Sequence, residues 1–164
     1  MPKRSDNGAE DDHPKRRGNH TPQPVRLDGG PLTLAQVAAV AHDGAEVTLT
    51  PTAIERVATA RALVDRLVAE DRTVYGITTG FGHLSRVKIA HDELAALQRN
   101  LVRSHASGVG EPFDIPTMRA VMLLLAASLA RGHSGVRLVV LEQLIAMLRT
   151  GVTPVVPMRG SVGA

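Results

Sequence analysis

The sequence predicts a mainly α-helical domain with little strand. Apolar residues recur at intervals of three and four over long stretches after Val25, which is the spacing of a buried helix face. Hydrophobic residues make up 43% of the chain but aromatic residues only 2%, so the core must be aliphatic. Clusters of Gly and Pro separate the apolar stretches, and there is no internal repeat.

The first 24 residues differ in composition from the rest of the chain. They carry charge, Asn, Gly, Pro and His, and almost no aliphatic side chains. Such a segment cannot bury enough apolar surface to offset its ordering entropy. We therefore expect a disordered charged tail over 1–24 and an ordered helical domain over 25–164.

Local signals place the first elements. Thr33 is a candidate N-cap, and Asp43-Gly44 is a stop signal. Thr50-Pro51 is a second helix start, because proline suits the first helical position. We expect a helix over 34–42, a short strand around 47–49, and a helix from 51 to about 71.

Three further helices are expected after a glycine-containing loop over about 72–89. Residues 118–130 are apolar almost all round, which indicates a central, buried helix with Gly132 at its C-terminal end. Thr150-Gly151 ends the last helix. The expected ranges are 92–105, 118–130 and 136–149, followed by an extended Pro/Gly segment over 152–164.

The segment Val74–Gly82 is the strongest candidate for half of an active site. It contains Tyr75, the single tyrosine of the chain, and three glycines that permit close backbone approach. A phenol has an ordinary pKa near about 10, and an environment that lowers it makes phenolate a general base. A phosphate cradle is disfavoured because the glycine order is reversed. The plainer alternative makes Tyr75 and Phe81 core anchors.

His105 ends an apolar stripe. Leu94, Leu97, Leu101 and His105 follow at helical spacing, and Ser104 precedes the histidine. One interpretation is a hydrogen-bonded core histidine. The other is a polar side chain that faces a pocket and exchanges a proton near neutral pH.

Several function classes are disfavoured. The chain has no Cys, which excludes disulfides and thiol catalysis and fits a cytoplasmic protein. The remaining histidines lack metal-ligand spacing, so no metal is expected. The net charge of +3 is scattered and aromatics are few, so nucleic acid is not expected as a partner. No apolar run reaches the ~20 residues of a membrane span.

Four motifs resemble the aromatic amino-acid ammonia-lyases, most closely the histidine ammonia-lyases among them. They are the segment 74–82, Leu97–Gly110, Arg131–Arg137 and Val155–Ala164, in the family's order. The resemblance covers about 25–164. It implies the N-terminal part of the helical ammonia-lyase/aspartase-like fold, with glycine-rich active-site loops. On this resemblance, 25–164 is an incomplete N-terminal helical active-site domain that lacks the family's central helical bundle.

The resemblance also implies a cofactor. Members of this family form methylidene-imidazolone from their own Ala-Ser-Gly tripeptide, and Ala164 matches its first residue. The Ser and Gly that should follow are absent from the sequence. Ser161 is no substitute, because the bulky, β-branched Val162 follows it. We therefore expect the 164-residue chain to be a fragment that is inactive by itself.

The same resemblance assigns roles to individual residues. Tyr75 matches the base that removes the β-proton of the substrate, and His105 matches a histidine on the substrate side. Substrate-binding residues are then His105, Ser104 and Gly82. The mobile lid comprises Gly76, Thr78, Thr79, Gly80 and Phe81.

The implied reaction is elimination of ammonia from L-histidine to give urocanate, the first step of histidine degradation, in a cytoplasmic homotetramer. The Ser104-His105 pair favours histidine as the substrate. Thr78-Thr79 stands where many histidine lyases have Asn-Thr, and it also occurs in aminomutases of the family. A phenylalanine or tyrosine lyase or an aminomutase therefore stays open, as does a non-enzymatic helical binding module.

Overall fold

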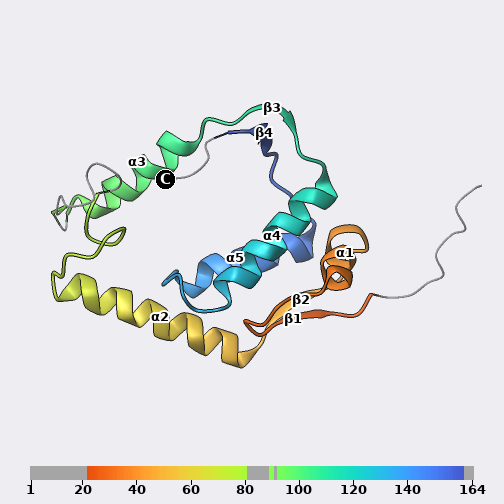
Figure 1. Ribbon diagram of the computed structural model, residues 1–164, viewed down its shortest axis with the longest axis horizontal. Helices are drawn as coiled ribbons and strands as arrows, with labels where there is room; N and C mark the ends of the chain where they lie inside the picture. Colours follow the sequence, from red (N-terminus) through yellow and green to blue (C-terminus); the bar gives the residue numbers. More distant parts are fainter. Residues whose placement is uncertain (1–21, 81–88, 91, 161–164) are drawn as a thin grey trace, which may run out of the picture.

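The computed structural model describes residues 22–80, 89–90 and 92–160 (Figure 1). Helices dominate this part of the chain, as the sequence predicts. In chain order the elements are β1 (Val25–Leu27), α1 (Leu34–His42), β2 (Val47–Leu49), α2 (Pro51–Ala69), α3 (Leu94–His105), β3 (Val109–Pro112), α4 (Ile115–Leu129), α5 (Leu138–Thr150) and β4 (Pro157–Arg159).

The core lies where α1, α4 and α5 pack together beside the β1–β2 pair. Its largest fully buried apolar side chains are aliphatic: Leu123, Leu141, Val25, Val40 and Val57. The two strands run parallel, with Val25 opposite Val47 and Leu27 opposite Leu49, and α1 connects them. The predicted aliphatic core is confirmed, whereas β1 was not expected as a strand.

The capping predictions for the first two helices are confirmed. The Thr33 side chain accepts the backbone N–H of Gln36, and the Gln36 side chain accepts the N–H of Thr33, which completes a capping box. Thr50 caps α2 in the same way through the N–H of Ala53 at 3.3 Å. These caps satisfy amides that the first helical turn leaves without a partner.

The predicted start of α4 at residue 118 was wrong. The Asp114 carboxylate accepts the N–H of Thr117 at 2.8 Å, and Pro116 lies in the first turn. The helix therefore begins at Ile115, three residues earlier. Asp followed by proline at the helix start was a readable signal in the sequence.

In the described chain α4 is buried on one face, whereas its apolar sequence predicts a central, buried helix. Its inward face comprises Met118, Met122, Leu123 and Ala126. Its outward face leaves Val121 47%, Leu124 51% and Leu125 47% exposed. None of the helices in the described ranges is both long and apolar enough to cross a membrane.

A long-range strand pair joins the region after α3 to the last described residues. In this antiparallel pair, Val109 of β3 lies opposite Arg159 of β4, and Pro112 lies opposite Pro157. The sequence had suggested only a helix end and an extended tail here. Figure 1 shows α3 set apart from the α1–α4–α5 core. The segment after α2 leads into α3, and β3 leads from it back to α4. The expected tail lies mostly outside the described residues, and β1 begins at Val25.

Candidate functional site

Tyr75 lies in a tight turn that follows α2. The backbone N–H groups of Ile77 and Thr78 both donate to the carbonyl oxygen of Val74, at 3.1 and 3.0 Å. Gly76 has a φ of 75°, which L-residues with a side chain rarely adopt. The glycine beside Tyr75 is therefore required by the backbone of the turn.

Two buried threonines stabilise this turn by hydrogen bonds to its backbone. Thr78 and Thr79 are only 3% and 1% exposed. The Thr78 hydroxyl accepts the N–H of Val74 at 2.9 Å and donates to the carbonyl oxygen of Arg72 at 2.6 Å. The Thr79 hydroxyl accepts the N–H of Gly76 at 3.4 Å and donates to the carbonyl oxygen of Gly80 at 3.0 Å. Both hydroxyls thus serve as donor and acceptor inside the turn.

The Tyr75 side chain is 60% exposed above this frame. It is not a core anchor, so the plainer sequence interpretation is wrong for this residue. The turn below the phenol is buried and hydrogen-bonded, while the phenol itself is exposed. This arrangement suits a catalytic group, because the scaffold fixes the backbone and the side chain stays accessible.

His105 is the last residue of α3 and is half-buried. Its Nδ1 lies 2.9 Å from the carbonyl oxygen of Leu101 and 3.1 Å from Ser104 Oγ. A carbonyl oxygen accepts only, so Nδ1 carries the proton in the neutral ring and Nε2 is left as the acceptor. Ser104 Oγ also donates to the Leu101 carbonyl oxygen at 2.9 Å. The ring is thereby held in one orientation by its own helix.

The apolar stripe that leads to His105 is present where the structure describes it. Leu97 and Leu101 are half-buried like His105, while Val102 on another face is 72% exposed. The hydrogen bonds of the His105 ring lie within α3, whereas the turn that carries Tyr75 also accepts the N–H of Ile89 at the Thr78 carbonyl oxygen, at 3.1 Å. Gly80 is buried beside Thr79, whereas Phe81, Gly82 and Ala164 lie outside the described residues.

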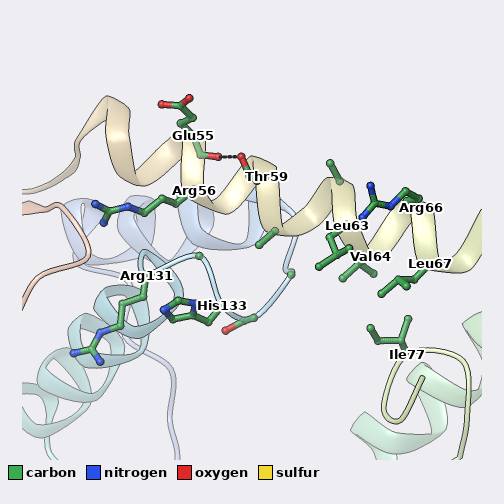
Figure 2. Close-up of a pocket in the computed structure, with 15 residues that line it drawn as sticks. Glu55, Arg56, Thr59, Leu63, Val64, Arg66, Leu67, Ile77, Arg131 and His133 are labelled. Atoms are coloured by element: carbon green, nitrogen blue, oxygen red, sulfur yellow. Dashed lines mark hydrogen bonds between the residues drawn. The ribbon is translucent and has the colours of Figure 1, made fainter. Parts of the chain in front are cut away.

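A groove along α2 was missed in the sequence interpretation (Figure 2). It encloses about 970 Å³ between α2 and residues 131–135, with Ile77 of the Tyr75 turn in its lining. Gly135 has a φ of +63°, and a Cβ there would lie 2.4 Å from Val64 Cγ2. A Cβ placed on Gly132 would lie 2.8 Å from the backbone carbonyl of Arg56. The glycines of the Arg131–Gly135 run are thus required by close contact with α2, a relationship between distant segments.

No metal site is apparent in the described ranges: they hold no group of three or more His, Cys, Asp or Glu side chains placed to bind an ion. The acid–base candidates that the sequence singles out in these ranges are the Tyr75 phenol and the His105 imidazole. A phenol and an imidazole can move protons or donate hydrogen bonds to a polar substrate.

Known proteins resemble this chain in both sequence and structure. A histidine ammonia-lyase of Symbiobacterium thermophilum is 56% identical over 136 residues, which are 83% of this chain and 27% of that protein. Ergothionase of Treponema denticola superposes with a TM-score of 0.81 at 33% identity, covering 85% of this chain and 28% of its own. A tyrosine aminomutase of Streptomyces globisporus superposes with a TM-score of 0.80 at 36% identity, covering 84% and 26%.

The chain therefore spans only about a quarter of the length of the relatives it matches. A family model described as aromatic amino acid lyase matches residues 32–164, which include every described element from α1 to β4. The predicted helical fold agrees with that of the structural neighbours. On this match the chain belongs to the aromatic amino acid lyase family.

Proposed function

We propose that this chain supplies the acid–base residues of an ammonia-lyase that converts L-histidine into urocanate and ammonia. The observation that carries the proposal is the 56% identity to the histidine ammonia-lyase of S. thermophilum across most of the chain. The geometry of the Tyr75 turn and of His105 supports it. The full activity belongs to a longer polypeptide of the kind the relatives have.

Tyr75 is the proposed base for the substrate β-proton. Its side chain is exposed on a turn whose backbone is fixed by the buried Thr78 and Thr79 hydroxyls. Proton transfer by a positioned side chain contributes about 10²–10⁴-fold to a rate. The segment from Gly76 to Gly82 then acts as the lid that excludes water during the transfer.

His105 is the proposed substrate-orienting residue. Because Nδ1 donates to the Leu101 carbonyl oxygen, the neutral ring offers Nε2 as an acceptor. An acceptor at this point favours a substrate that carries an N–H or O–H donor on its side chain. The imidazole of L-histidine has such a donor and the phenyl ring of phenylalanine has none. Ser104 contributes by sharing the Leu101 carbonyl with the ring.

In this proposal methylidene-imidazolone supplies the electrophile that activates the substrate amino group. Ala164 is the residue of this chain that would enter it, and the Ser and Gly of the tripeptide are not in the sequence. Assembly as a cytoplasmic homotetramer is part of the same proposal.

A second candidate is an aminomutase acting on tyrosine. It is favoured by the 36% identity to the tyrosine aminomutase of S. globisporus and by the Thr78-Thr79 pair. A tyrosine phenol also carries an O–H donor for His105 Nε2. The two candidates differ in product: urocanate with release of ammonia in one, a β-amino acid in the other.

A fusion of this chain to the unmatched remainder of the S. thermophilum enzyme separates these candidates. We expect release of urocanate and ammonia from L-histidine and no β-amino acid from L-tyrosine. A His105→Leu variant should lose its preference for histidine. Turnover of tyrosine in place of histidine by the unaltered fusion would establish the second candidate instead.

A further inference from the structure

One face of α2 carries an apolar stripe that no other described helix covers along its length. Ala60, Leu63, Val64 and Leu67 lie at positions i, i+3, i+4 and i+7, and all four line the groove. Leu63 is 46% exposed. Figure 2 shows Leu63, Val64 and Leu67 on the same side of α2, with Ile77 facing Leu67.

The other half of the groove carries two arginines. Arg56, Arg131 and His133 gather there, and the same three residues line an adjoining cavity of about 510 Å³ with Gly29 and Pro31 (Figure 2). The guanidinium of Arg56 donates to the backbone carbonyl oxygen of Asp28 at 2.7 Å. This acceptor is neutral, so the contact does not compensate the positive charge of Arg56. Glu55 is the single acidic residue among those that line the groove.

The dimensions fit a helix. The groove follows α2 from Arg56 to Leu67, eleven steps of 1.5 Å along the helix axis, which is about 17 Å or roughly three helical turns. A stripe at i, i+3, i+4 and i+7 is the surface into which the apolar face of a second helix packs. A cationic end adds attraction for carboxylates on that helix.

We propose that this groove is the docking site for an amphipathic helix with an apolar stripe and acidic residues at one end, supplied by the remaining polypeptide of a full-length lyase. The relatives contain roughly three times as much further chain as the part matched here. Charge complementarity selects an acidic helix over a second copy of this chain, whose groove is itself basic.

Docking also bears on the Tyr75 turn. Ile77 is hydrogen-bonded within that turn through the Val74 carbonyl oxygen, and its side chain lines the apolar half of the groove. A helix seated against Leu67 contacts Ile77 and so restrains the backbone that carries Tyr75. The docking inference rests on membership of the family and is independent of which amino acid the enzyme uses.

The test is a titration of the 164-residue chain with the unmatched remainder of the S. thermophilum histidine ammonia-lyase. Tyr75 is the only tyrosine of the chain, so biosynthetic fluorotyrosine gives one fluorine resonance that reports on the turn. We expect this resonance to shift on binding. Leu63→Glu and Arg131→Glu should each raise the dissociation constant at least about tenfold, and circular dichroism should show unchanged helix content.

Leu34→Glu is the matched control, because Leu34 is 89% exposed on α1, away from the groove. It should leave the dissociation constant within about twofold of the unaltered chain. Absence of binding, or equal effects of all three substitutions, would overturn the proposal. Self-association of the chain that Leu63→Glu abolishes would also overturn it, in favour of a second copy in the groove. Binding is measured without turnover, so failure of the proposed activity leaves this result intact.

Discussion

The hydroxyl of Thr78 donates to the carbonyl oxygen of Arg72 at 2.6 Å while it accepts the N–H of Val74. One buried side chain thus closes the turn that carries Tyr75. The suggested lid residues that the structure describes, 76–80, have a defined backbone arrangement. The stability of this turn therefore depends on Thr78, whereas the exposed phenol belongs to Tyr75.

Thr78→Val should loosen the turn. Valine has nearly the same shape but neither accepts from Val74 nor donates to Arg72, which leaves two backbone groups without their partner. The expected cost is about 1–3 kcal/mol of unfolding free energy. Tyrosine fluorescence reports on the turn selectively, because the chain has one Tyr and no Trp. Thr150→Val, where an exposed hydroxyl donates to Ala146 at 2.8 Å, is the control and should cost less.

Gly135→Ala should destabilise the contact between α2 and residues 131–135. The new Cβ would lie 2.4 Å from Val64 Cγ2, and the φ of +63° adds backbone strain. Gly44→Ala isolates the strain, because Gly44 has a φ of +69° with nothing within 4 Å of its Cβ position. That control should cost about 1–2 kcal/mol. Chemical denaturation should show a larger loss for Gly135→Ala, and equal losses would refute the close contact.

Arg119→Met should weaken the core at the ends of two helices. Its Nε donates to the Val40 carbonyl oxygen at 2.9 Å and its Nη1 to the Leu148 carbonyl oxygen at 3.0 Å. Hydrogen bonds from charged groups contribute about 1.5–3 kcal/mol. Thermal unfolding of Arg119→Met and of Arg149→Met, an exposed arginine on α5, compares the two sites. Similar midpoints for both variants would contradict this role.

Asp114 should make stability depend on pH. Hydrogen bonds from Thr117, its side chain first and its backbone second, hold the pKa of this carboxyl below its ordinary value. A lowered folded-state pKa stabilises the fold above the unfolded pKa of about 3.9, and this contribution is lost as pH falls through the folded value. Asp114→Asn still caps α4 but does not titrate. The stability difference between the two proteins should therefore shrink as pH falls below about 4, and a difference that stays constant would exclude this linkage.

Local signals predicted much of the fold. Thr33, Thr50 and Gly151 mark helix ends by interactions within a few residues, and each lies where the sequence placed it. The start of α4 was missed although Asp114 and Pro116 signal it. Exposure of Tyr75 could not be read from the sequence, because an aromatic residue beside glycines is equally suited to a core.

Relationships between distant segments account for the rest. Pairing of β3 with β4 brings Val109 to Arg159, and the α2 groove depends on residues 131–135 meeting Val64. Neither follows from periodicity, which reports only on neighbours within one element. The outward face of α4 is apolar, and hydropathy does not say whether the surface that covers such a face belongs to the same segment.

The most direct test of the central claim is the rate of urocanate formation by the fusion with the S. thermophilum remainder, compared with its Tyr75→Phe variant. Phenylalanine keeps the ring and removes the acid–base group. The account predicts activity of the fusion on L-histidine and a fall in kcat of about 10²–10⁴-fold in the variant. An unchanged kcat in the Tyr75→Phe fusion would contradict the assignment of Tyr75 as the base.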